Sequence, residues 1–65
     1  MTTRQISEAA CQEALRRGFG PRIADWFVRG AYAQYTGKLA VPSHFPRRGW
    51  YLDGARWAQS KQVAQ

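Results

Sequence analysis

The chain has 65 residues, 45% of them hydrophobic, with ten Lys and Arg against four Asp and Glu, a formal net charge of +6 at pH 7. This length predicts one small domain over residues 1–65, and the hydrophobic content argues against intrinsic disorder. One Cys and one His exclude an internal disulfide and a Cys/His zinc site, so we expect no metal and no cofactor. No apolar run resembles a signal peptide or a membrane span, and we expect a cytoplasmic protein without a membrane partner.

Residues 1–18 predict an N-terminal helix. Thr2 stands three residues before Gln5, which is the spacing of a capping box, and Ser7 followed by Glu8 offers an alternative start. Gly18 is typical of the position just beyond a helix C-terminus.

One face of this first helix is predicted to be apolar. The residues on this stripe are Ile6, Ala10, Ala14 and Leu15. Cys11 lies in the same Ala-rich segment, where a lone Cys is usually a small buried apolar residue. We therefore expect the stripe and Cys11 to belong to the core.

Residues 19–38 predict a second helix, in which Pro21 suits the first turn and Gly37 suits the end. Gly30 costs about 1 kcal/mol of helix propensity relative to Ala, so its presence predicts the close approach of another helix or a large ring. The expected buried face follows the 3–4 spacing of a helix and comprises Ile23, Trp26, Phe27, Gly30, Ala33 and Gly37.

Residues 39–46, with the sequence LAVPSHFP, contain two prolines and no helical period, which predicts a connector. Its apolar side chains, Leu39, Val41 and Phe45, are expected to tuck against the helices. A third helix is predicted over residues 47–61, with Trp50, Gly54, Trp57 and Ala58 on its buried side. Small residues on both helices predict close packing, so we expect an all-α, three-helix protein whose last two helices form a hairpin (21–61) joined by this Pro-containing connector.

Groups suited to catalysis are sparse. Asp25 has Arg22 three residues before it and Arg29 four residues after it, a spacing that predicts an ion pair. Cys11 and His44 could be imagined as a nucleophile and its base, but the buried role expected for the thiol argues against this. We expect a binding protein without catalytic residues.

Arginine supplies eight of the ten cations, and several lie beside aromatic residues. Arg47 and Arg48 open the third predicted helix, where they oppose the helix macrodipole unless an anion compensates. Arginine and exposed rings together suit RNA, because guanidinium groups contact phosphate and unstacked bases lie on rings, whereas most Trp area is expected in the core. The candidate RNA-binding residues are Arg16, Arg17, Arg22, Arg29, Lys38, Arg47, Arg48, Tyr51 and Arg56.

Two stretches, RGAYAQYTGK (29–38) and YLDGARWAQ (51–59), resemble the two signature stretches of the ribosome modulation factor family. The first stretch matches at Arg29, Gly30, Ala33, Gly37 and Lys38, and the second matches approximately at Tyr51, Leu52, Gly54 and Arg56. The resemblance covers residues 27–60. It implies a helical stationary-phase factor that binds RNA of the small ribosomal subunit, blocks initiation and promotes ribosome dimers, as in ribosome hibernation.

The wider family also includes short CrpP-like proteins, and this branch implies an ATP-dependent kinase that modifies fluoroquinolones and confers antibiotic resistance. Phosphoryl transfer needs a phosphate cradle, a carboxylate that holds the metal and a positioned base, which two isolated aspartates hardly provide. A third hypothesis is a phage- or plasmid-type effector that binds a host protein through its aromatic face. The ribosome or a structured RNA is the partner that we expect.

Overall fold

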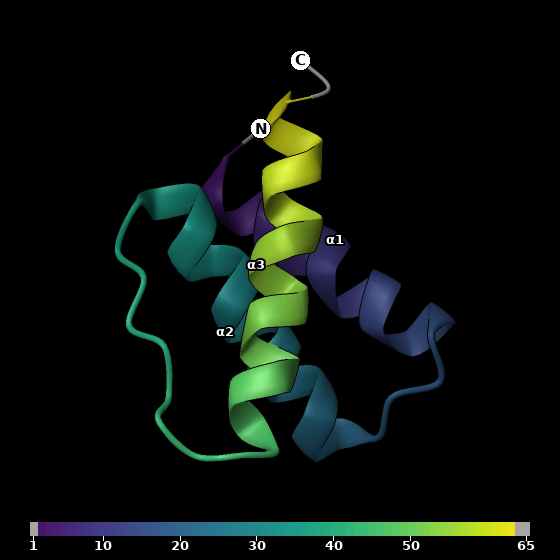
Figure 1. Cartoon of the computed structure of the whole chain (residues 1–65). Helices are drawn as coiled ribbons and strands as arrows, with labels where there is room; N and C mark the ends of the chain where they lie inside the picture. Colours follow the sequence, from purple (N-terminus) through teal and green to yellow (C-terminus); the bar gives the residue numbers. More distant parts are fainter. Residues whose placement is uncertain (1, 64–65) are drawn as a thin grey trace.

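The computed structural model describes residues 2–63 of the chain. It contains three helices, α1 (Thr3–Arg16), α2 (Pro21–Thr36) and α3 (Arg47–Val63), and no strand within the described residues (Figure 1). The predicted all-α, three-helix fold is therefore confirmed.

The first helix begins where the capping box predicts. The Thr2 hydroxyl accepts a hydrogen bond from the Gln5 backbone N–H at 3.1 Å, and the Gln5 side-chain oxygen accepts from the Thr2 N–H at 2.8 Å. Two N–H groups that would otherwise lack partners at the helix start are satisfied in this way. The start lies at Thr3, and the alternative start near Ser7 is wrong.

Glycines end the first two helices, as predicted. Gly18 has a φ of +80° and Gly37 a φ of +74°, the left-handed conformation that favours glycine. The residue after each glycine turns its N–H back into the helix: Phe19 donates to the Ala14 carbonyl at 3.0 Å, and Lys38 donates to Ala33 at 2.9 Å. This is the Schellman arrangement. Pro21 occupies the first turn of α2, which is also as predicted.

The core is built largely from small residues. Ala10 and Ala14 of α1, Phe27 and Ala31 of α2, and Ala58 of α3 form one fully buried cluster. Ile6 is fully buried as well, so this part of the predicted α1 stripe is confirmed. Leu15, however, is 66% exposed, and its prediction as a core residue is wrong, because the stripe that meets α2 is centred on the alanines.

Helices α2 and α3 cross in close contact at two glycines, Gly30 and Gly54, as the sequence predicts. A Cβ atom on Gly30 would overlap the backbone carbonyl oxygen of Tyr51, and a Cβ on Gly54 would overlap the carbonyl oxygen of Phe27. Each glycine thus admits the main chain of the other helix. The remainder of the predicted α2 face is partly wrong: Ile23 and Trp26 are only half-buried and Gly37 is exposed.

The buried side of α3 differs from the predicted one. Gly54 and Ala58 are buried as predicted, but Tyr51 and Ala55 complete the face, while Trp50 and Trp57 are half-buried at its margin. The Trp57 ring reaches Phe27 with 5.9 Å between ring centroids. The reason is geometric: the main chain of α2 lies against Tyr51 and Gly54, so the side of α3 that carries Tyr51, Gly54 and Ala58 faces α2.

The connector between α2 and α3 runs along the outside of the helices, from the end of α2 back to the start of α3 (Figure 1). Because both helices start at the same end of the molecule, they cross without forming the predicted hairpin. The apolar side chains of the connector do not tuck against the helices as predicted, since Leu39 is 48%, Val41 42% and Phe45 78% exposed. The two helices already contact each other through their glycines, so the connector is not needed to fill space between them.

Candidate nucleic-acid interface

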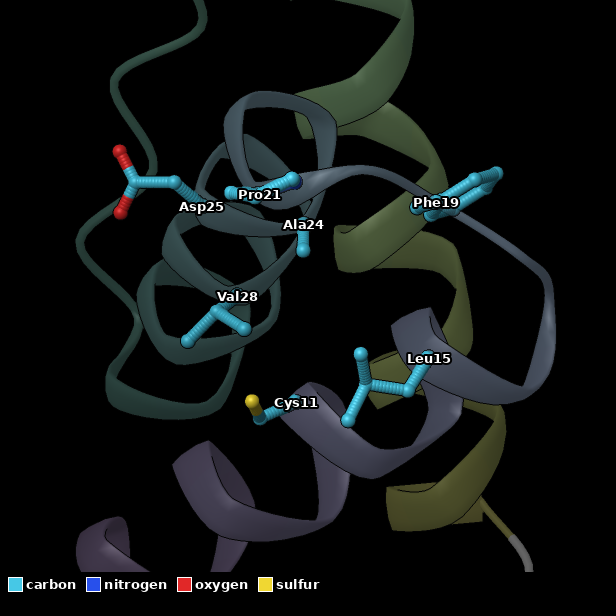
Figure 2. Close-up of a pocket in the computed structure, with 7 residues that line it drawn as sticks. All are labelled: Cys11, Leu15, Phe19, Pro21, Ala24, Asp25 and Val28. Carbon is cyan, nitrogen blue, oxygen red and sulfur yellow. The ribbon is translucent and has the colours of Figure 1, made fainter.

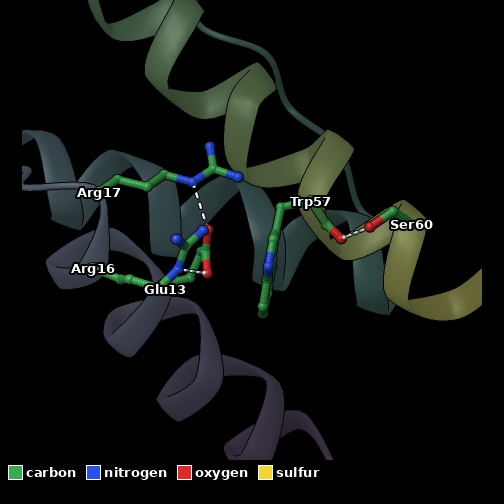
Figure 3. Close-up of polar contacts among 5 residues, drawn as sticks. All are labelled: Glu13, Arg16, Arg17, Trp57 and Ser60. Carbon is green, nitrogen blue, oxygen red and sulfur yellow. Dashed lines mark hydrogen bonds and ion pairs between the residues drawn. The ribbon is translucent and has the colours of Figure 1, made fainter.

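The carboxylate of Glu13 binds two of the candidate RNA contacts. Its Oε2 atom lies 2.6 Å from an Arg16 nitrogen and 2.7 Å from Arg17 Nε (Figure 3). These hydrogen bonds, first from Arg16 and then from Arg17, lower the pKa of Glu13 to about 2. Arg17 also lies over the Phe27 ring, 4.9 Å from its centroid. Both arginines therefore already have a carboxylate partner in the folded protein.

Arg29 is also paired. Its Nε lies 3.1 Å from Asp25 Oδ2, and its guanidinium stands 5.0 Å from the centre of the Trp26 ring. The predicted ion pair of Asp25 is thus confirmed, with Arg29 as its partner. Arg29 stays exposed, but an arriving phosphate would compete with a carboxylate that already holds it.

Five candidate contacts remain exposed, and within the described residues none of them forms an ion pair with a carboxylate. These are Arg22, Lys38, Arg47, Arg48 and Arg56. The chain's excess positive charge is therefore concentrated on α2, the connector and α3. We call Arg22, Arg47 and Arg48, which lie in the first turns of α2 and α3, the basic end.

The basic end coincides with two helix N-termini. Neither α2 nor α3 has an acidic residue in its first turn, and α2 has no side-chain cap. The first turns of the two helices lie at the same end of the molecule (Figures 1 and 2). The macrodipole favours anions at a helix start, and cationic side chains there add to this potential. At α3 the N–H groups of Arg48 and Gly49 already donate to backbone carbonyls, so the arginine side chains would make the contacts there. The arrangement suits phosphate groups.

Tyr51, the ninth candidate contact, is not placed for RNA binding. It is only 5% exposed, and its hydroxyl oxygen accepts a hydrogen bond from the Ala40 N–H at 3.0 Å. The prediction that Tyr51 lies on an exposed face is wrong, because it packs beside the α2–α3 crossing and ties the connector to α3.

Phe45 is the residue that sequence reasoning missed. It was assigned to the interior, yet it is the most exposed of the large apolar side chains and stands two residues before Arg47. Its neighbours in the sequence, Pro46 followed by two arginines, were the available sign, since a residue in a Pro-rich connector has no helical face to bury it.

A second surface feature is an apolar groove of about 450 Å³ between α1 and α2 (Figure 2). It is lined by Cys11, Leu15, Phe19, Pro21, Ala24, Asp25 and Val28. Cys11 is exposed there, so its predicted burial is wrong. Figure 2 shows the Asp25 carboxylate pointing away from the apolar residues of the groove, which leaves the groove itself without a charged group aimed into it.

The described residues offer neither a metal site nor a membrane span. Within residues 2–63, no three His, Cys, Asp or Glu side chains gather into a group that could hold a metal ion. His44 is exposed and its Nδ1 lies 3.0 Å from the Ser43 hydroxyl. None of the helices in the described part combines the length and the hydropathy needed to cross a bilayer.

The fold and this surface define a small all-α protein whose basic end forms no ion pair within residues 2–63. No known protein family, no curated protein and no solved structure matches the chain.

Proposed function

We propose that the chain binds RNA on the ribosome and represses translation, in the manner of the ribosome modulation factor family that it resembles. The observation that carries the proposal is the set of five exposed cations without a carboxylate partner, three of which form the basic end. Four of the five are arginines, whose planar guanidinium groups match phosphate geometry in two-point contacts.

The cations of the N-terminal part of the chain are paired with carboxylates, which argues against a role for them in RNA binding. Arg4, Arg16 and Arg17 pair with Glu8 and Glu13 of α1. Paired cations contribute less to binding a polyanion, because the phosphate must displace the carboxylate or tolerate it nearby. We therefore assign RNA contact to Arg22, Lys38, Arg47, Arg48 and Arg56, and not to the paired cations of the N-terminal part of the chain.

Binding of a labelled RNA hairpin over a range of salt concentrations tests the electrostatic part. Five phosphate contacts predict a slope of log affinity against log salt of roughly −3.5 to −4.5. The variant Arg47→Gln/Arg48→Gln should make the slope shallower by about 1.5 to 2 and weaken binding on every RNA tested.

A matched control is Arg4→Gln/Arg16→Gln, which removes the same net charge from paired positions on α1. It should leave the slope nearly unchanged. Equal losses in the two variants would mean that only the net charge matters, and a flat dependence on salt in the wild type would contradict the proposal.

Co-sedimentation with ribosomes tests the biological part. We expect the wild type to migrate with the small subunit and to lower the yield of a cell-free translation reaction, and the Arg47→Gln/Arg48→Gln variant to lose both effects. Retention of a partner after nuclease treatment of a lysate would instead support the alternative of a host-protein effector. If the wild type binds free RNA but not ribosomes, the proposed ribosomal partner is wrong and the proposed RNA binding stands.

A further inference from the structure

Phe45 is exposed beside two unpaired cations. Its side chain is 78% exposed, and Arg47 and Arg48 follow it immediately after Pro46. No acidic residue stands between Asp25 and Asp53 in the sequence, so every Lys, Arg, Asp or Glu in the segment that carries Phe45 is a cation. An exposed Phe in such a segment suits a ligand that offers both a flat apolar face and negative charge.

The backbone on both sides of Phe45 is fixed to the start of α3. The His44 carbonyl accepts a hydrogen bond from the Arg48 N–H at 3.1 Å, and the Pro46 carbonyl accepts from the Gly49 N–H at 3.1 Å. The ring is thus carried by an anchored turn. An anchored ring loses less conformational entropy on binding than a ring on a free loop.

The chemistry of the surroundings identifies the ligand. The faces of nucleobases stack on aromatic rings, and the phosphates that join them are bound by arginine. Bases inside a duplex are already stacked on each other, so a protruding ring reaches only an unpaired base. A lipid surface would also accept Phe with Arg, but a single exposed ring beside two arginines suits a base and its flanking phosphates.

We propose that Phe45 is a stacking platform for an unpaired base, and that the RNA bound at the start of α3 is single-stranded, with Arg47 and Arg48 on the flanking phosphates. The proposal rests on the proposed function, because it specifies the kind of RNA that the basic end accepts.

Fluorescence anisotropy with three RNAs of equal length tests it: a single strand, a perfect duplex, and a single strand whose bases are replaced by abasic sites. Phe45→Ala should bind the single strand roughly 5- to 150-fold more weakly than the wild type, the range expected for one base–ring stack. On the duplex and on the abasic strand, the variant and the wild type should bind alike.

Two further variants separate stacking from simple apolar contact. Phe45→Trp keeps an aromatic face and should retain single-strand affinity, whereas Phe45→Leu keeps apolar area without a ring and should lose affinity as Phe45→Ala does. All three changes are at an exposed position, and circular dichroism with urea unfolding should give wild-type helicity and stability.

Several outcomes would overturn the proposal. Unchanged single-strand affinity in Phe45→Ala would remove the ring from the site, and full affinity in Phe45→Leu would replace stacking by apolar contact. Loss of binding to phosphatidylglycerol vesicles in Phe45→Ala, with RNA binding intact, would assign the ring to a lipid surface. If the wild type binds RNA but prefers the duplex, this inference fails while the proposed function stands; if the wild type binds no RNA, both fail.

Discussion

The backbone carbonyl of Tyr51 occupies the place where a side chain at position 30 would begin, so Gly30 and Tyr51 bring the main chains of α2 and α3 into direct contact. In the same way, the backbone carbonyl of Phe27 on α2 occupies the place where a side chain at position 54 would begin, so here the glycine lies on α3. The two helices are therefore held by reciprocal contacts, in which each provides a glycine and receives a carbonyl.

Replacing Gly30 by alanine should lower the free energy of unfolding by about 1–3 kcal/mol, because the added methyl group forces the helices apart. The better helix propensity of alanine, worth about 1 kcal/mol, offsets only part of this loss. Urea unfolding followed by circular dichroism measures the change. Gly49→Ala is the matched control, since a Cβ at this α3 position meets nothing within 4 Å, and it should leave stability unchanged or slightly raised. Equal effects at the two positions would contradict the close crossing.

Stability should fall in acid through Glu13. The pKa of its carboxyl is lowered from 4.5 to about 2 in the folded protein by its bonds to Arg16 and Arg17. The unfolded chain therefore takes up the proton first, and the contribution of Glu13 is complete above pH 4.5 and is lost as the pH falls towards 2.

Urea unfolding at pH 6 and at pH 2.5 checks this expectation. Glu13→Gln should be less stable than the wild type at pH 6, and the difference should narrow at pH 2.5. Glu8→Gln removes a carboxylate from the exposed Arg4 pair and is the control, because such surface pairs contribute little. A difference for Glu13→Gln that stays constant with pH would contradict the role of the charge.

Tyr51→Phe should affect stability and not RNA binding. The change removes the hydroxyl oxygen that accepts the Ala40 N–H, a loss of about 0.5–1.5 kcal/mol for a partly buried hydrogen bond. Thermal unfolding and RNA anisotropy on the same sample separate the two effects. If the variant has wild-type stability but binds RNA more weakly, Tyr51 contributes to RNA binding and this prediction is wrong.

Cys11 should react with a thiol reagent in the folded protein. Its side chain is exposed beside the groove between α1 and α2, so Ellman's reagent should modify it without unfolding. We expect the rate in buffer to lie within about tenfold of the rate in urea. Cys11→Ser should change stability by no more than about 0.5 kcal/mol, as surface substitutions usually do. Protection of the thiol in buffer would show that it is covered.

The helix boundaries were the part of the fold that the sequence predicted best. Thr2 with Gln5, Gly18, Pro21 and Gly37 each act through the local backbone, so their effect is visible in a few consecutive residues. The close α2–α3 crossing was also predictable, because a glycine inside a helix is costly unless something needs the space.

The faces of α3 were harder to predict, since two stripes fit the helical period equally well. One contains Trp50 and Trp57, the other Tyr51 and Ala55, and both include Gly54 and Ala58. The choice between them depends on how α2 approaches, which is a property of the pair of helices. The same reason explains why Tyr51 was placed among the RNA contacts.

The sequence predicts which cations are candidates for the interface, but not which of them are left without a carboxylate partner. The sequence identifies every arginine, while their distribution between internal pairs and free positions depends on rotamers and on neighbours one helical turn away. Arg29 could be assigned to Asp25 from spacing alone. The capture of both Arg16 and Arg17 by one carboxylate, Glu13, was not foreseen.

The main-chain contact at the glycines also has a consequence for recognition. The main chains of α2 and α3 touch at the crossing, and this direct contact limits sliding of one helix along the other. The first turns of the two helices extend from this crossing, with Arg22 on α2 and Arg47 and Arg48 on α3. Under the proposed function, the crossing sets the distance between these guanidinium groups, so a methyl group added at Gly30 would alter RNA binding without changing any charge.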